Sequence, residues 1–267
     1  MTDTAAIGVF DSGIGGLTVA REIMRQLPNE RVVYFGDTAR VPYGPKSPDT
    51  VRRYSREIAD FLQAQGVKAI VVACNTATAH ALEMLRGELT IPVIGVVDPG
   101  AAAAVEATRG GGIGVIGTTG TIASKAYERA IRQRAPETRI VVQACPLFVP
   151  LVEEGWIDKP ATRLVAEEYL GPMRDAHIDT LVLGCTHYPL LKRLIGDVLG
   201  REVRLIDSAE QTALETRRVL DERGMRAPAE TRPRHRFIAS DAPEQFLKLG
   251  QRFLGSAVDE VETVMLG

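Results

Sequence analysis

Several features that would narrow the function at once are scarce or missing in this sequence. Only 3 cysteines and 4 histidines occur among 267 residues, and no Cys-x-x-Cys or His-x-x-x-His spacing predicts a zinc site. The N-terminus lacks the basic and apolar segments of a signal peptide, so neither export nor a disulfide is expected. No apolar run approaches the roughly 20 residues that span a bilayer. A net charge of −2 argues against an electrostatic nucleic-acid binder.

These absences leave a cytoplasmic protein as the expectation, with no metal, membrane or nucleic-acid partner. The hydrophobic fraction of 45% and the charged fraction of 25% are typical of globular proteins. A chain of 267 residues can form one large domain or two of ordinary size.

The sequence does have a regular alternation of short apolar runs and helical stretches. The pattern predicts strands at 6–10, 31–35, 69–73, 92–97, 113–116, 140–143, 180–183, 203–206 and 236–239. It predicts helices at about 16–26, 49–65, 77–86, 99–107, 122–134, 159–175, 189–199, 210–221 and 243–254. Apolar strands that alternate with helices are typical of mainly parallel sheets covered on both faces, so the predicted fold class is α/β.

The chain also reads as two similar halves. One apolar run ends at Asp11 and a similar run ends at Thr118; Cys74 and Cys185 follow them at similar distances along the chain. This similarity predicts a pseudo-twofold axis that places the two thiols symmetrically about one cleft. We expect residues 1–97 and about 208–267 to form the first domain, and about 98–207 the second.

Two of the three cysteines lie in matching positions. Cys74 and Cys185 each end an apolar run, and a polar segment that contains threonine follows each directly. Ligands bind at the carboxyl ends of strands in α/β sheets, so both thiols are candidates for chemistry. Two thiols presented alike suggest an acid and a base on opposite sides of one substrate. We interpret Cys145 as a small buried core residue.

Two loops after predicted strands carry further candidates. Asp11 ends the first strand, where a purely structural reading accounts for the glycines after it but not for the acid. Ser12 can cap the helix that follows. In the loop 36–44, a proline and Gly44 flank Tyr43, which suggests a loop shaped to contact a ligand, although the same pattern also suits a surface turn.

Two candidates come from the second half. His187 lies two residues after Cys185, and a neighbouring imidazole can lower the pKa of a thiol towards neutrality. Glu153 stands near Gly155, where a glutamate is as often a solvated helix end.

The segment 112–117 matches the G-x-G-x-x-G fingerprint letter for letter, but the strand lies inside the motif instead of before it. A nicotinamide site is therefore not expected. The turn 118–121 contains three threonines and could bind an anion at the N-terminus of the next helix.

Four motifs together resemble the cofactor-independent aspartate/glutamate racemase family. They are Asp11-Ser12-Gly13-Ile14-Gly15-Gly16-Leu17, Pro42-Tyr43-Gly44, Ala73-Cys74-Asn75-Thr76-Ala77 and Gly184-Cys185-Thr186-His187-Tyr188-Pro189. The resemblance runs from about residue 7 to residue 254, and the two cysteine motifs together are highly specific. It implies two similar Rossmann-like or flavodoxin-like α/β domains with a buried site between them. It also implies interconversion of L- and D-glutamate with no pyridoxal phosphate, metal or other cofactor.

By resemblance, Cys74 and Cys185 are the catalytic acid/bases. Asp11 assists Cys74, and Glu153 and His187 assist Cys185. Cys74 would abstract the α-proton of D-glutamate, and Cys185 that of L-glutamate. The implied substrate contacts are Asp11, Ser12, Tyr43, Gly44, Asn75, Thr76, Thr186 and His187. The implied role is the supply of D-glutamate for peptidoglycan in a bacterial cytoplasm, and we expect a homodimer.

Three alternatives remain open. The substrate could be another amino acid such as aspartate, because the side-chain length of the substrate cannot be read from the sequence. Cys74 could instead be the nucleophile of a cysteine-dependent hydrolase, which would need only one thiol. A binding module without turnover is the third, and exchange of the α-proton with solvent would exclude it.

Overall fold

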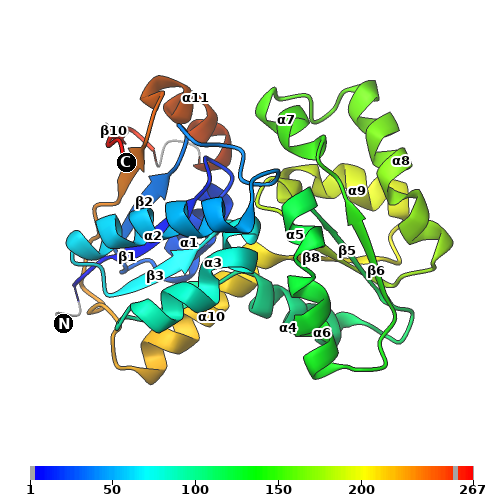
Figure 1. Ribbon diagram of the computed structural model, residues 1–267, viewed down its shortest axis with the longest axis horizontal. Helices are drawn as coiled ribbons and strands as arrows, with labels where there is room; N and C mark the ends of the chain where they lie inside the picture. The colour runs from blue at the N-terminus through cyan, green and yellow to red at the C-terminus, as the bar shows by residue number, and fades with distance from the viewer. Residues whose placement is uncertain (1–3, 255–257, 267) are drawn as a thin grey trace.

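The computed structural model describes residues 4–254 and 258–266, and its strands form two sheets (Figure 1). The larger sheet has the order β10-β9-β2-β1-β3-β4 and comprises β1 (Ile7–Asp11), β2 (Val32–Gly36), β3 (Ala69–Val72), β4 (Val93–Gly95), β9 (Arg236–Ala239) and β10 (Glu262–Thr263). The smaller sheet has the order β6-β5-β7-β8 and comprises β5 (Ile113–Gly117), β6 (Ile140–Ala144), β7 (Thr180–Gly184) and β8 (Arg204–Asp207). All neighbouring strands are parallel, which confirms the predicted α/β class.

The two sheets share one connectivity. The strands β1 to β4 lie in the order β2-β1-β3-β4, and β5 to β8 repeat that order as β6-β5-β7-β8. In this repeat β3 is equivalent to β7. Cys74 follows β3 and Cys185 follows β7, so the two thiols stand at equivalent strand ends. The two halves are therefore similar in topology as well as in sequence pattern.

Helices cover both faces of the larger sheet, whose strands β1, β2 and β3 are buried throughout. On one face pack α1 (Leu17–Gln26), α10 (Ser208–Glu222) and α11 (Pro243–Leu254). On the other pack α2 (Pro48–Ala64) and α3 (Asn75–Glu88). The apolar strands need this double cover, because an exposed face would leave them in contact with water.

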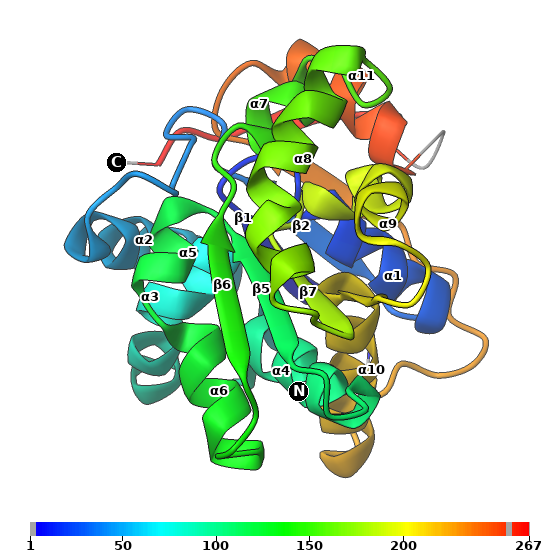
Figure 2. The same ribbon diagram turned by 90° about the vertical axis from the view of Figure 1, so that its right-hand side faces the viewer.

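The smaller sheet is covered in the same way. The helices α7 (Phe148–Glu153), α8 (Pro160–Asp175) and α9 (Lys192–Leu199) and the 3₁₀ turn η1 (Tyr188–Leu191) share a core with one face, and α4 (Val97–Ala107) and α6 (Ala126–Arg134) with the other. The short helix α5 (Thr119–Ala123) follows the carboxyl end of β5 (Figure 2). In the described part of the chain, no helix is both long and apolar enough to cross a membrane.

Local chemistry accounts for where several helices begin. Ser47 accepts a hydrogen bond from the Thr50 N–H at 3.3 Å, and proline occupies the first position of α2. Cys74 caps α3, because its Sγ accepts the N–H of Ala77 at 3.4 Å. Thr118 caps α5 by accepting the N–H of Thr121. Two residues singled out in the sequence therefore lie at helix N-termini, where the backbone favours negative charge.

Four elements differ from those predicted. The helix expected at 122–134 is divided into α5 and α6 at Lys125, whose φ of 55° interrupts it. The stretch 189–199 begins with the turn η1 before α9 continues it. The sequence pattern also missed α7 and β10, since six and two residues are too few to show a hydrophobic period.

Candidate active site

Cys74 lies at the junction of β3 and α3 and is 6% exposed. Its thiol donates to the Ser12 hydroxyl oxygen at 3.7 Å. Burial and the nearby charge of Asp11 raise the pKa of Cys74 to about 12, although the hydrogen bonds of Ala77 and Ser12 oppose the rise. The charge of Cys185 adds a smaller rise. Near neutral pH, Cys74 therefore holds its proton.

Cys185 follows β7 and is 5% exposed. Its Sγ lies 3.8 Å from Nδ1 of His187, whose Nε2 lies 3.0 Å from Oε1 of Glu153. Burial acts to lower the pKa of His187, but hydrogen bonds and charge interactions with Cys185 and Glu153 raise it to about 10. His187 is therefore an imidazolium near neutral pH, and one of its N–H groups faces the Cys185 sulfur.

Asp11, at the carboxyl end of β1, is also buried. Its Oδ2 accepts the Gly13 N–H at 3.0 Å, whereas its buried Oδ1 has no hydrogen-bond partner among the described residues. Burial raises the pKa of Asp11; the positive charge of His187 and backbone N–H groups oppose this rise. Asp11 thus interacts electrostatically with groups of both halves.

Segments of the two halves pack closely around these groups. A Cβ on Gly15 would lie 2.3 Å from the Thr186 hydroxyl oxygen and 2.6 Å from the ring of His187, so only glycine fits there. The Thr18 hydroxyl also donates to the carbonyl of Thr186 at 3.2 Å. Close packing between the two halves explains why both thiols are buried.

Tyr43 and Gly44 bring the loop after β2 to the same region. Gly44 lies against Thr118 of the other half, where an added Cβ would come within 3.1 Å of the threonine Cβ. Tyr43 is buried, and its hydroxyl donates to Asp37, which also accepts hydrogen bonds from Arg40 and Ser240.

Asp37 is not among the site residues predicted from the sequence. Its place directly after β2, at a strand end, was the available signal. Its buried carboxylate joins the loop of Tyr43 to the end of β9, where Ser240 lies.

Asn75 and Thr76 extend from the first turn of α3 towards the second half. The Thr76 hydroxyl lies 2.9 Å from that of Thr118 and 3.2 Å from that of Thr121. Asn75 accepts a hydrogen bond from the Tyr127 hydroxyl, and its buried Nδ2 has no partner within the described ranges. The threonine turn noted in the sequence therefore meets the segment that follows Cys74.

Glu153 and Cys145 make no hydrogen bond to Cys74 or Cys185 among the described residues. The side chain of Glu153 contacts His187 and is 32% exposed. A cavity of about 90 Å³ lies beside it, under Phe246 and Leu249 of α11. Cys145 is fully buried, and its thiol donates to a backbone carbonyl at 3.7 Å, as suits a core residue.

No group of three or more His, Cys, Asp and Glu side chains within residues 4–254 and 258–266 could hold a metal ion. The strand β5 runs through the glycine motif 112–117, which confirms that this motif lacks the strand-turn-helix arrangement of a dinucleotide site.

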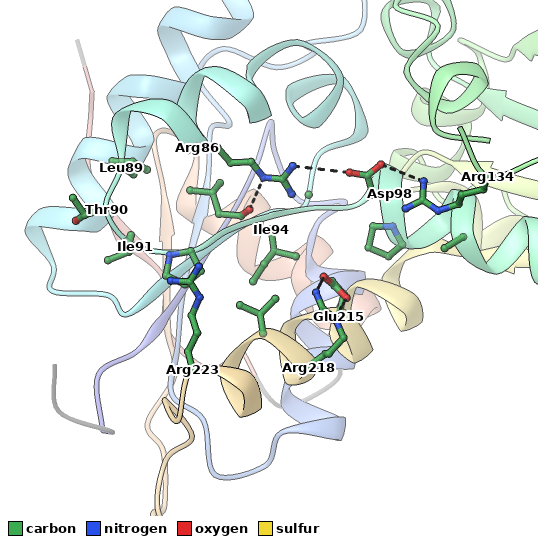
Figure 3. A pocket seen from close by; sticks show the side chains of 16 residues that line it. Arg86, Leu89, Thr90, Ile91, Ile94, Asp98, Arg134, Glu215, Arg218 and Arg223 are labelled. Atoms are coloured by element: carbon green, nitrogen blue, oxygen red, sulfur yellow. Dashed lines mark hydrogen bonds and ion pairs between the residues drawn. The ribbon is translucent and has the colours of Figure 1, made fainter. Parts of the chain in front are cut away.

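A larger surface cavity of about 630 Å³ lies away from the thiols, between α3, β4, α4, α6 and α10 (Figure 3). Arg86, Arg134, Arg218 and Arg223 line it together with acids. Most of these charges pair with each other: Asp98 lies within 4.0 Å of Arg86 and Arg134, and Arg218 lies 2.7 Å from Glu215. The cavity contains none of the candidate site residues.

Comparison with known proteins places these residues in context. Residues 7–216 match the model of the Asp/Glu/Hydantoin racemase family. The chain belongs to this family. A glutamate racemase of Geobacter metallireducens is 55% identical over 98% of this chain and 97% of its own.

Solved structures of the family agree. The glutamate racemase isoform RacE1 of Bacillus anthracis superposes with a TM-score of 0.94 at 42% identity, covering 100% of this chain and 98% of its own. The glutamate racemase of Francisella tularensis in complex with D-glutamate has a TM-score of 0.92 at 40% identity, with 98% of each chain covered. The racemase family thus shares the two-sheet architecture described above.

Proposed function

We propose that Cys74 and Cys185 are the acid and base of an amino-acid racemase and face one substrate from opposite sides. The observation that carries this proposal is the pair of buried thiols at equivalent strand ends of the two halves. Racemisation removes the α-proton from one face and returns a proton to the other, so it needs a base and an acid in such an arrangement.

The reaction is the interconversion of L- and D-glutamate, and the chain is an isomerase. Its relatives at about half identity over nearly the whole chain are glutamate racemases. The complex of the Francisella tularensis relative supports glutamate as the substrate, because its bound ligand is D-glutamate. We further propose that the D-glutamate serves peptidoglycan synthesis in a bacterial cytoplasm.

Two unpaired polar atoms support an amino-acid substrate independently. Asp11 Oδ1 is a buried acceptor and Asn75 Nδ2 a buried donor, and neither has a hydrogen-bond partner among the described residues. An unsatisfied buried polar atom costs about 1–3 kcal/mol, so a ligand that pairs both is favoured. The α-ammonium group would donate to Asp11, and the α-carboxylate would accept from Asn75. We propose Ser12, Tyr43, Gly44, Thr76, Thr186 and His187 as the further substrate contacts.

The protonated thiol of Cys74 suits the direction that starts from L-glutamate. In that direction Cys185, which faces the His187 imidazolium, would take the α-proton, and Cys74 would donate its own proton to the opposite face. General acid–base catalysis contributes only about 10²–10⁴-fold. The remainder must come from hydrogen bonds that strengthen as negative charge develops on the substrate carboxylate. For D-glutamate the two thiols exchange roles, with Asp11 assisting Cys74, and Glu153 and His187 assisting Cys185.

The decisive experiment is incubation with L-glutamate, and separately D-glutamate, in D₂O without added cofactor. We expect the optical rotation to decay to zero from either enantiomer, while deuterium enters the α-position of glutamate. A hydrolase or a binding module would show neither change. Activity lost on exhaustive chelation and restored by one metal would contradict the proposal that no cofactor is required.

A panel of amino acids separates glutamate from the remaining alternative, aspartate. We expect glutamate to be racemised with the highest kcat/KM, and faster turnover of aspartate would overturn the assignment.

We also propose that residues 1–97 with 208–267 form one domain and 98–207 the other; 1–3, 255–257 and 267 lie outside the described residues. We propose a homodimer as well, for which light scattering should give twice the mass of one chain.

A further inference from the structure

Tyr127, in the first turn of α6, is 2% exposed and contacts both cysteine segments. Its hydroxyl donates to Oδ1 of Asn75 at 2.7 Å, and Asn75 directly follows Cys74. Its ring packs against Gly184, which directly precedes Cys185: a Cβ on Gly184 would lie 3.1 Å from Cε2 of Tyr127. One side chain therefore contacts a neighbour of each thiol.

The hydrogen bonds of Tyr127 have a defined direction. Burial raises the pKa of Tyr127, and the neighbouring Ser208 side chain opposes that rise. Because a carboxamide oxygen can only accept, the Tyr127 hydroxyl is the donor in its hydrogen bond with Asn75. The other end of that carboxamide, Nδ2, is then left as a buried donor with no partner in the described part of the chain.

We propose that Tyr127 is a positioning residue that holds Asn75 with Nδ2 towards the substrate carboxylate and supports the backbone before Cys185. Without the phenol hydroxyl, the carboxamide of Asn75 can rotate and present its oxygen to the carboxylate, which repels it. The inference rests on the proposed substrate contact of Asn75. Tyr127 itself touches no reacting atom.

The test is a double-mutant cycle between Tyr127→Phe and Asn75→Ala. Tyr127→Phe removes only one oxygen atom, and we expect kcat/KM for glutamate to fall about tenfold, the scale of one misplaced hydrogen bond to a charged group. Asn75→Ala should cost at least as much. In the Asn75→Ala background, Tyr127→Phe should change kcat/KM by less than about twofold, because the carboxamide that Tyr127 positions is already absent.

Tyr169→Phe is the matched control, since Tyr169 lies on α8 and its hydroxyl accepts a hydrogen bond from the Leu147 N–H, outside the segments of both site cysteines. It should leave kcat/KM unchanged. If Asn75→Ala were harmless, the substrate contact of Asn75 would be wrong. If Asn75→Ala were costly but Tyr127→Phe were not, or if Tyr127→Phe cost the same in both backgrounds, the positioning role would be overturned. Circular dichroism of each variant separates these outcomes from misfolding.

Discussion

Cys74 and Cys185 stand at equivalent strand ends, but the groups around them differ in charge. Beside Cys74 lie the Asp11 carboxylate and the Ser12 hydroxyl, and burial with the Asp11 charge raises the pKa of Cys74 to about 12. Beside Cys185 lies His187, which Cys185 and Glu153 hold protonated against the effect of burial. One thiol has an anionic neighbour and the other a cationic one.

This difference teaches that a repeated fold need not give two chemically equal halves. A racemase must begin each turnover with a proton on one thiol only, because two neutral thiols offer no base and two thiolates offer no acid. The acidic neighbour of Cys74 favours its protonated form, and Cys185 has a cationic neighbour. In the proposed mechanism Cys74 is therefore the acid and Cys185 the base, which is the direction that starts from L-glutamate.

The largest expected effect comes from removing either thiol. Cys74→Ser and Cys185→Ser should each lower racemisation by at least about 10³-fold, since a serine hydroxyl is neither acidic nor basic enough near neutral pH. Cys145→Ser is the control and should retain nearly full activity. Either active-site variant at near wild-type rate, or an inactive Cys145→Ser variant of normal stability, would refute the two-thiol assignment.

The same two variants can distinguish the roles of Cys74 and Cys185 in a second reaction, the elimination of chloride from threo-3-chloroglutamate. This reaction needs only one base. Cys74→Ser should act only on the stereoisomer whose α-proton faces Cys185, and Cys185→Ser only on the other. Since the pKa of Cys74 is about 12, the rate of Cys185→Ser should rise steadily with pH above neutrality. Elimination from both stereoisomers by one variant would contradict opposite placement of the thiols.

A smaller effect is expected from the charged neighbours. His187→Asn should lower kcat about 10²-fold with L-glutamate and less with D-glutamate, because it removes the imidazolium beside Cys185, the thiol proposed to act on L-glutamate. Asp11→Asn should show the reverse preference. Substrates deuterated at the α-carbon provide the measurement, since the kinetic isotope effect should grow in the impaired direction. Equal loss of kcat in both directions for both variants would show that the neighbours do not act on separate thiols.

The smallest effect is a shift in pH dependence. His187 loses its proton as pH rises through about 10, so kcat/KM should fall there. Glu153→Gln removes the carboxylate that helps to raise the pKa of His187, and the alkaline limb should move to lower pH by about one pH unit. The interaction of His187 with Glu153 should also stabilise the folded protein. That contribution to the free energy of unfolding is complete below the pKa of His187 in the unfolded chain, and it is lost as pH rises through about 10.

Glu154→Gln is the matched control, because Glu154 is the exposed neighbour of Glu153. Its pH profile should coincide with that of the unsubstituted protein. An unchanged alkaline limb in Glu153→Gln would mean that Glu153 does not tune His187.

Much of this arrangement could be predicted from the residues. Apolar runs of four or five residues between helical stretches predict parallel strands, and β1 to β3 are buried throughout as that pattern requires. Strand ends are the places where side chains enter the crevice, which is why Asp11, Cys74 and Cys185 could be singled out. His187 is close to Cys185 in sequence, so its nearness to the thiol was readable as well.

The contacts between distant segments were decided by the tertiary structure alone. Tyr127 sits inside a helix, where its pattern is that of any core residue, and only the packing of α6 against both thiol segments brings it to Asn75. The sequence around Glu153 did not indicate a role for it, because α7 is too short to show a hydrophobic period. The packing of α7 beside η1 brings the Glu153 carboxylate within hydrogen-bond distance of His187. Sequence patterns record which residues face a core or end a strand, because those properties are local. Charge states and hydrogen-bond partners depend on neighbours that are distant in sequence. Those neighbours are determined only when the two halves pack against each other in the folded protein.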